Sequence, residues 1–191
     1  VKYFLQKAEE RLKKFTHEGL HYALYPWGAS QRQTLPSFYN LHKLRGAVVC
    51  KAEIARGIGK ALGMEVRIPH GATGDVDTDL RSKAKATVEL LQQYDFVVTH
   101  FNGTDEAAHR YDALEKVAFI ERIDKEFLGT VLDAVREPLK IVICGDHVTS
   151  SVTGKHDRGA GPVISAFSDG RSMVKLENYR DIIKFLMKEC D

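Results

Sequence analysis

The sequence predicts an α/β fold, in which a mostly parallel sheet carries helices on both of its faces. Short apolar runs alternate along the chain with longer segments of helical periodicity. Such alternation is typical of parallel strands joined by helical crossovers. With 191 residues, 43% of them hydrophobic, the chain can bury a sizeable core. We expect one domain over residues 1–191, with 1–45 as a connecting segment and 46–191 as the functional core.

The strands are expected where short apolar or β-branched runs end at Gly, Pro or charged residues. They are 47–50, 65–68, 95–100 and 140–144, and a further strand is expected at 22–27. We expect strand 140–144 to be buried. The helices are expected at 3–15, at 36–44 beginning with a proline, at 52–62 ending before Gly63, at 79–93 and at 113–136. Asp79 or Thr78 would cap the helix at 79–93.

Carboxylates and histidines collect in the segments that follow the later strands. Asp105 and His109 are four residues apart, so one helical turn would bring both to the same ion. Asp146 and His147 follow an apolar strand at its carboxyl end, where open α/β sheets place ligands, and His156 comes soon after. Oxygen and nitrogen ligands together suit Mn, Zn, Mg or Co. Taken singly, each group also fits a solvated helix face, a cap or a turn. Their convergence favours a divided site for two divalent metals.

A glycine-rich loop, Gly-Ala-Thr-Gly at 71–74, precedes the predicted helix 79–93. Its glycines permit close approach of the backbone to an anion. The loop lacks the Lys and Ser/Thr of a nucleotide-binding P-loop, so a role in cradling ATP is not expected. Thr73, Lys83 and His70 are candidates for contact with a substrate phosphate or carboxylate. The alternative is that the loop is a sharp turn and that Lys83 and His70 are surface residues.

Four sequence blocks occur in a fixed order between residues 46 and 163. They are 55–64 (Ala-Arg-Gly-Ile-Gly-Lys-Ala-Leu-Gly-Met), 71–79 (Gly-Ala-Thr-Gly-Asp-Val-Asp-Thr-Asp), 104–109 (Thr-Asp-Glu-Ala-Ala-His) leading to 120–124, and 145–149 (Gly-Asp-His-Val-Thr) with His156 and a Gly-Pro-Val at 161–163. In order and spacing, they resemble the C-terminal half of archaeal-type cofactor-independent phosphoglycerate mutases, members of the alkaline phosphatase superfamily.

The resemblance implies a metalloenzyme with an alkaline-phosphatase-like core and two divalent metal ions, Mn being favoured. By that resemblance, Asp105, His109 and His156 would bind one metal, and Asp146 and His147 would help to bind the other. The implied activity is the interconversion of 3-phosphoglycerate and 2-phosphoglycerate through a phosphoserine. A phosphatase, a homoserine kinase of the same superfamily, and a non-catalytic metal-binding domain are the alternatives.

The chain also departs from the family that it resembles. The family completes its second metal site with an Asp near the N-terminus and a nucleophilic Ser or Thr, and nothing in 1–44 resembles either. We therefore expect a core that is incomplete at its N-terminus, inactive alone, and covered at an open strand edge or apolar patch by a missing half or by another chain. Ala108 stands where the family has Gly, and Arg110 and Tyr111 replace small residues, which predicts narrower access to the metal.

Composition bounds the remaining function classes. The 28 Lys and Arg residues against 26 Asp and Glu give a net charge of +2, which gives no reason to expect a nucleic-acid partner. No run approaches the roughly 20 apolar residues of a membrane span. Three cysteines, Cys50, Cys144 and Cys190, are far apart in the sequence. We expect Cys50 and Cys144 to be buried free thiols, which favours a reducing cytoplasm.

Overall fold

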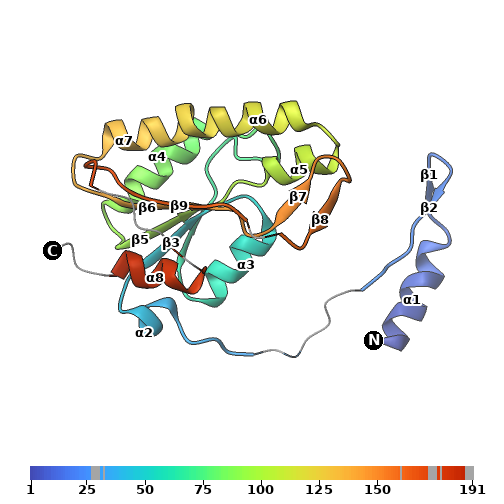
Figure 1. The fold of residues 1–191 in the computed structure, drawn as a ribbon. Coiled ribbons are helices and arrows are strands. Elements are labelled where there is room, and N and C mark those ends of the chain that lie inside the picture. The colour runs from blue at the N-terminus through green and yellow to red at the C-terminus, as the bar shows by residue number, and fades with distance from the viewer. Residues whose placement is uncertain (27–30, 32, 160, 172–175, 177, 188–191) are drawn as a thin grey trace. The chain divides into compact units, whose positions relative to one another are not determined.

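The computed structural model describes residues 1–26, 31, 33–159, 161–171, 176 and 178–187. Contacts between Cα atoms divide the chain into two units, Val1–Thr34 and Leu35–Asp191, each of which is described by itself (Figure 1). This division is close to the predicted segment 1–45 and core 46–191, which remain a prediction.

The first unit holds one helix and a small hairpin. Helix α1 (Lys2–Leu12) ends three residues earlier than predicted and buries none of its side chains. Strands β1 (Thr16–His17) and β2 (Leu20–His21) pair in an antiparallel way. The strand predicted at 22–27 is wrong, because residues 22–26 form no regular structure and position 27 lies outside the described residues. The hairpin of β1 and β2 ends at His21, before that apolar run begins.

A three-stranded parallel sheet forms the centre of the second unit. The chain passes through α2 (Phe38–His42), β3 (Gly46–Val49), α3 (Glu53–Ala61), β4 (Glu65–Arg67), α4 (Leu80–Leu91) and β5 (Phe96–Thr99). The strand order is β4-β3-β5, and Val48 of the central strand aligns with Val66 on one side and Val98 on the other. The strands and helices predicted here are confirmed, with ends that differ by a few residues.

The central strand is buried because both of its neighbours and a helix cover it. Ala47 and Val49 are fully buried and form a core cluster with Ala86 and Leu90 of α4. The predicted cap of α4 is also confirmed, since the Asp79 carboxylate accepts a hydrogen bond from the backbone N–H of Ser82 at 2.9 Å. That bond satisfies one of the free N–H groups at the start of the helix.

A short helix and a long one follow β5. They are α5 (Gly103–His109) and a continuous run of α6 (Ala113–Arg122), the π-helical segment η1 (Ile123–Leu128) and α7 (Gly129–Ala134). The helix predicted at 113–136 is therefore confirmed, with a wider turn in its middle. Arg122, at the start of that turn, bonds both Glu126 and the backbone oxygen of Val76. This anchors the helix to the segment that follows the glycine-rich loop.

The last strands form two separate antiparallel pairs. Strand β6 (Lys140–Cys144) pairs with β9 (Val163–Phe167), and β7 (Val148–Ser150) pairs with β8 (Lys155–Asp157) as a hairpin; helix α8 (Arg180–Met187) follows. The bounds predicted for 140–144 are confirmed, but its burial is wrong. Ile143 is 46% exposed, and so is its cross-strand partner Ile164 at 52%. In the described part of the chain β6 pairs with β9 alone, so its second edge carries no paired strand.

The same difference changes the expectation for the cysteines. Cys50 is buried, as predicted, and burial raises the pKa of its thiol. Cys144 is exposed, so its predicted burial is wrong. Cys190 lies outside the described residues. The cytoplasmic location inferred from buried thiols thus rests on Cys50 and remains a prediction.

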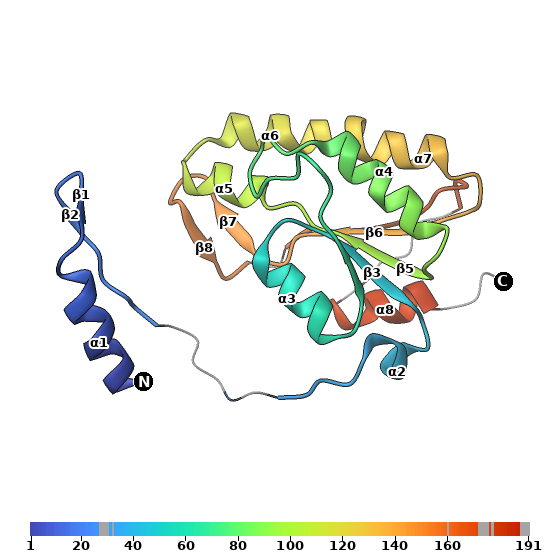
Figure 2. The same cartoon turned by 180° about the vertical axis from the view of Figure 1, so that it is seen from behind.

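Helices cover both faces of the strands, which confirms the predicted fold class. Helices α4, α6 and α7 lie on one side, and α3 and α8 lie on the other (Figures 1 and 2). Helix α5 and the β7–β8 hairpin lie together at one end of this unit, where β5 and β6 lead into them. Segments from two distant parts of the chain therefore meet at this end.

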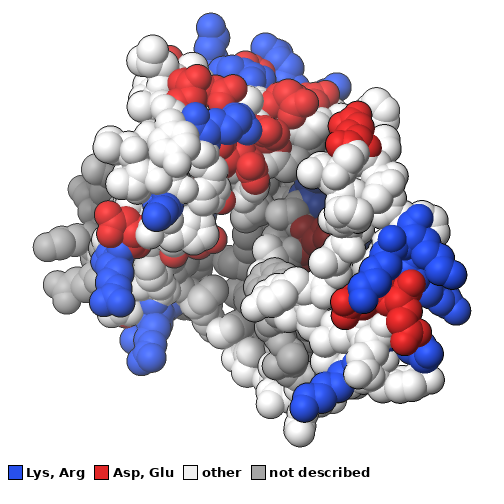
Figure 3. Space-filling view, turned by 90° about the vertical axis from the view of Figure 1, so that its right-hand side faces the viewer, with Lys and Arg blue, Asp and Glu red and all other residues white. Residues whose placement is uncertain are grey.

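Charged side chains of both signs are interspersed on the molecular face shown in Figure 3. This agrees with the balanced composition of the chain. Within the residues that the structure describes, no helix combines the length and the apolar character needed to cross a membrane.

Candidate metal centre

The candidate centre begins at the first turn of α5, which is held tightly against its surroundings. Gly103 is buried, and a Cβ atom there would lie 2.6 Å from the Phe119 ring and 2.8 Å from the backbone nitrogen of Val76. Only a glycine lets the helix start so close to both. This packing fixes Asp105, two residues later, on the side of the helix that faces the hairpin.

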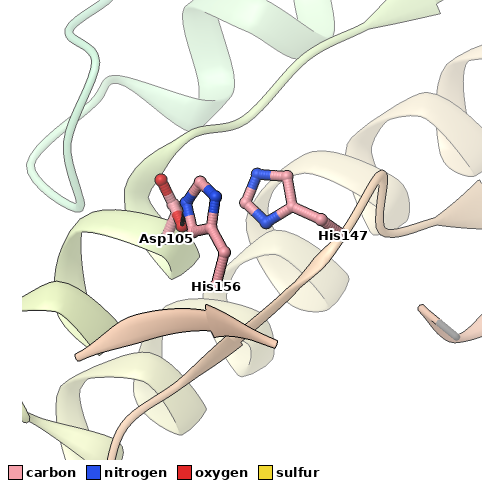
Figure 4. A group of neighbouring side chains, drawn as sticks. All are labelled: Asp105, His147 and His156. Carbon is pink, nitrogen blue, oxygen red and sulfur yellow. Dashed lines mark ion pairs between the residues drawn. The ribbon is translucent and has the colours of Figure 1, made fainter. Parts of the chain in front are cut away.

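Three side chains converge between α5 and the hairpin. Asp105 comes from α5, His147 from the segment before β7, and His156 from β8. Figure 4 shows their polar ends directed toward one another, and one ligand atom of each lies within 4.8 Å of the others. The Nε2 atom of His156 is 3.5 Å from Asp105 Oδ1, and the two imidazole rings are 4.0 Å apart between centroids.

His109 lies beside this group. Its Nε2 atom is 3.4 Å from Asp105 Oδ2, and its ring centroid is 5.2 Å from that of His156. The other ring nitrogen, Nδ1, is 2.7 Å from the backbone oxygen of Gly154. Asp105 and His109 thus share one helix face, as their spacing predicts.

Asp146 stands apart from the group, with a side chain that is 82% exposed. One of its oxygens is 3.7 Å from His147 Nε2 and also accepts the backbone N–H of His147. The family resemblance implied that His147 binds a different ion from Asp105 and His156, whereas the structure places all three side chains together. How the five residues divide between two metals remains a prediction.

The donor set fits a divalent cation. One carboxylate and two or three imidazoles make the mixed oxygen and nitrogen set preferred by Zn, Mn, Co and related ions. Ligand atoms that bind one ion at about 2.1 Å lie about 3 to 3.5 Å apart, from simple coordination geometry. The separations of 3.4 and 3.5 Å around Asp105 match that spacing.

Two residues that contact the candidate ligand side chains were not identified from the sequence. Thr149 is buried, and its hydroxyl lies 2.5 Å from Asp105 Oδ1 and 3.1 Å from His147 Nδ1. The two-residue spacing of His147 and Thr149 along an extended segment was the available signal, because such positions share a face. Gly154 contributes through a backbone oxygen, for which residue types carry no signal.

The candidate substrate residues lie in different surroundings. The Thr73 hydroxyl is 2.5 Å from Asp77 Oδ1, inside its own loop, and His70 is exposed. Lys83 is only 1% exposed, so the alternative that it is a surface residue is wrong. Its ammonium group donates to the backbone oxygen of His100 at 2.9 Å, and burial lowers its pKa to about 8. Substrate contacts of Thr73, Lys83 and His70 remain predictions.

The bulky residues after His109 are both held by neighbours. Arg110 donates to both carboxylate oxygens of Asp75, at 2.8 and 2.9 Å, and to Glu115 at 2.7 Å. This guanidinium lowers the pKa of the Asp75 carboxyl. Tyr111 lies against the hairpin at Gly154. The narrower access predicted from these two residues remains a prediction.

Comparison with known proteins gives this arrangement a family context. Residues 7–182 match the family described as the Metalloenzyme superfamily. The chain is 39% identical over 150 residues to the 2,3-bisphosphoglycerate-independent phosphoglycerate mutase of Methanopyrus kandleri, which covers 78% of this chain and 35% of that protein. It is 44% identical over 138 residues to the corresponding mutase of Saccharolobus islandicus, covering 72% of this chain and 33% of that protein. The chain thus spans about a third of the length of these relatives.

Solved structures agree with the fold. A protein of Pyrococcus horikoshii superposes with a TM-score of 0.66 at 37% identity, over 71% of this chain and 41% of that one. The cofactor-independent phosphoglycerate mutase of Thermoplasma acidophilum matches with a TM-score of 0.52 at 21% identity, over 81% of this chain and 40% of that one, which bears on the fold alone. The matched family, the relatives and the grouping of Asp105, His147 and His156 lead to one conclusion: this chain belongs to the Metalloenzyme superfamily.

Proposed function

We propose that this chain is the metal-binding part of an enzyme that interconverts 3-phosphoglycerate and 2-phosphoglycerate by phosphoryl transfer. The observation that carries the proposal is the meeting of Asp105, His147 and His156 at one end of the fold. Similarity to archaeal phosphoglycerate mutases over 72% or more of the chain supports this substrate class.

In this proposal, Asp105, His147 and His156 hold divalent metal, together with His109 and Asp146. When bound, two metals in such a site would neutralise phosphoryl charge and lower the pKa of a hydroxyl nucleophile. The contribution of this chain is to orient the ligand side chains before the metal binds. Thr149 holds the Asp105 carboxylate through its hydroxyl, and Lys116 in turn donates to the Thr149 backbone oxygen at 2.8 Å.

The nucleophilic serine or threonine and the remaining metal ligand are proposed to lie outside this chain, in the missing half of the enzyme or in another chain. Apolar side chains on α3, β6 and β9 offer it a surface, since Ile54, Ile58, Ile143 and Ile164 are between 46% and 69% exposed. Uncovered apolar surface of this kind favours a partner. The isolated chain should then bind metal but show no mutase activity.

Metal binding and turnover should be measured separately. Calorimetric titration of the metal-free chain with Mn²⁺ should detect binding, and Asp105→Asn should weaken it at least tenfold, because one of the shared ligand atoms is lost. Asp133→Asn, which removes an exposed carboxylate on α7, should leave binding unchanged. Zn²⁺, Mg²⁺ and Co²⁺ titrations would identify the preferred ion. Equal affinity in the two variants would exclude this site.

Turnover needs an assay that separates the candidate reactions. The chain, alone and mixed with the matching N-terminal portion, would be given 3-phosphoglycerate, and 2-phosphoglycerate and free phosphate would be quantified separately. The proposal expects 2-phosphoglycerate from the mixture only. Free phosphate as the main product would indicate a phosphatase, and ATP-dependent phosphorylation of homoserine would indicate a kinase. Metal binding without turnover in either preparation would indicate a non-catalytic domain. Each of these outcomes would overturn the mutase proposal.

A further inference from the structure

The tip of the β7–β8 hairpin contacts α5 at His109. The backbone oxygen of Gly154 lies 2.7 Å from His109 Nδ1, although the two residues are 45 positions apart. A carbonyl oxygen can only accept a hydrogen bond, so Nδ1 must carry the proton. In the neutral ring, the lone pair then sits on Nε2, which is the atom 3.4 Å from Asp105 Oδ2.

Gly154 is itself held in place by Tyr111. Its backbone has a φ of +62°, a left-handed conformation that other residues rarely adopt. A Cβ atom at Gly154 would lie 2.8 Å from Cζ and 3.0 Å from Cε1 of the Tyr111 ring. The ring therefore lies in the space that a side chain at position 154 would need.

Tyr111 is placed for this contact by the end of α5. It has a φ of +63°, unusual for a bulky residue, and its N–H bonds the backbone oxygen of Ala108 at 3.0 Å. The side chain is nonetheless 64% exposed, so burial of the ring does not account for this conformation. Backbone strain in an exposed aromatic residue, two positions after His109, is consistent with a positioning role.

We propose that Tyr111 and Gly154 form a positioning pair that fixes His109 as the Nδ1–H tautomer and presents its Nε2 to a metal beside Asp105. The inference rests on the metal site of the proposed function and adds two residues to it. Orientation of a ligating histidine by a backbone carbonyl on its other nitrogen is a general device of metal sites. Here the carbonyl comes from the same hairpin that carries His156, so one contact sets the relative position of two ligands.

The test compares the tautomer of His109 with metal affinity. Tyr111→Ala should remove the restraint on Gly154, so that nitrogen chemical shifts of the metal-free protein report a mixture of tautomers at His109. Mn²⁺ affinity measured by calorimetry should fall about tenfold. Tyr111→Phe keeps the ring and should match the wild type in both measurements. Tyr22→Ala, which removes an exposed tyrosine from the first unit, is the matched control.

A second variant tests the glycine. Gly154→Ala should reduce affinity more than Tyr111→Ala, because the added Cβ meets the ring and the backbone is left-handed. Gly170→Ala is the control that separates the left-handed backbone from the clash with the ring, since Gly170 has a φ of +82° but nothing within 4 Å of its Cβ position. An unchanged Nδ1–H tautomer in both Tyr111→Ala and Gly154→Ala would overturn the positioning pair. A wild-type chain that binds no Mn²⁺ would instead overturn the metal site, and the tautomer measurement would still decide whether the pair orients His109.

Discussion

The hydroxyl of Thr149 lies 2.5 Å from Oδ1 of Asp105, across 44 residues of sequence. A carboxylate accepts hydrogen bonds, so the threonine is the donor, and the bond fixes the plane of the Asp105 carboxylate. The same hydroxyl is 3.1 Å from His147 Nδ1. Thr149 thus joins two of the three clustered side chains.

Replacing Thr149 with Val should therefore damage the centre without changing its shape. We expect a loss of about 1 kcal/mol in the free energy of unfolding, because a buried hydrogen bond is removed. Mn²⁺ affinity should fall about tenfold or more, as it does when partners of metal ligands are deleted. Thr149→Ser keeps the hydroxyl and should retain most of the affinity. Denaturant unfolding and calorimetry would measure both quantities, and full affinity in Thr149→Val would contradict the proposed role.

Metal removal should lower the thermal stability of the chain. An ion that binds only the folded state, at a concentration about 100 times its Kd, adds about 2.7 kcal/mol of stability. Mn²⁺ should therefore raise the Tm, and a chelator should reverse the change. The Tm of His156→Gln should respond little to Mn²⁺, whereas His17→Gln, at an exposed position of the first unit, should respond like the wild type. Identical shifts in both variants would place the ion elsewhere.

Lys83 should make stability depend on pH in the alkaline range. Burial lowers the pKa of Lys83 from 10.5 to about 8 in the folded state. Between pH 8 and 10.5 the unfolded chain therefore binds more protons than the folded chain, so the free energy of unfolding rises with pH. Lys83→Met removes the buried charge and should stabilise the protein at pH 7 by about 1 to 2 kcal/mol, less than the full cost of the lowered pKa because the bond to His100 is lost as well.

The advantage of Lys83→Met should shrink as the pH rises from 8 to 10.5. Urea unfolding of both proteins across this range would measure it. Lys85→Met is the control, because Lys85 lies two residues after Lys83 on the same helix but is exposed, and it should show no such trend. A pH-independent difference between Lys83→Met and the wild type would indicate that Lys83 does not titrate in this range.

Gly103→Ala should destabilise the start of α5. The new Cβ would meet the Phe119 ring and the backbone of Val76. Such overpacking forces neighbouring atoms to shift and should lower the free energy of unfolding by about 1 to 3 kcal/mol. Gly57→Ala lies inside α3 with open space around its Cβ position, so there the higher helix propensity of Ala should stabilise by about 0.5 to 1 kcal/mol. Thermal unfolding of the two variants should therefore shift in opposite directions.

The sequence was informative where local pattern and burial agree. The run at 47–50 is apolar because β3 lies between two strands and under α4, so pattern and environment coincide. The run at 140–144 has the same character, but its exposure depends on which strands lie beside it. That is a property of the assembled sheet and not of the segment, which is why the predicted burial of Ile143 and Cys144 was wrong.

The same distinction applies to the candidate centre. Asp105 and His147 could be identified because their chemistry is uncommon and they follow strands. The contacts of Thr149 and Gly154 could not, since each joins segments about 45 residues apart. Lys83 shows the opposite error, because a lysine is usually exposed, and its burial follows from its place on the inner face of α4.

The chain between Asp105 and His156, about 50 residues long, contains the whole of the long helix and all of β6. An ion bound by both Asp105 and His156 would close this segment into a loop, as a cross-link does, and would restrict the unfolded chain. Residues 103–157 would then open as one cooperative unit with the ion bound and as smaller pieces without it. Metal occupancy would in this way govern local unfolding and susceptibility to proteolysis along the whole segment, quite apart from any chemistry performed at the ion.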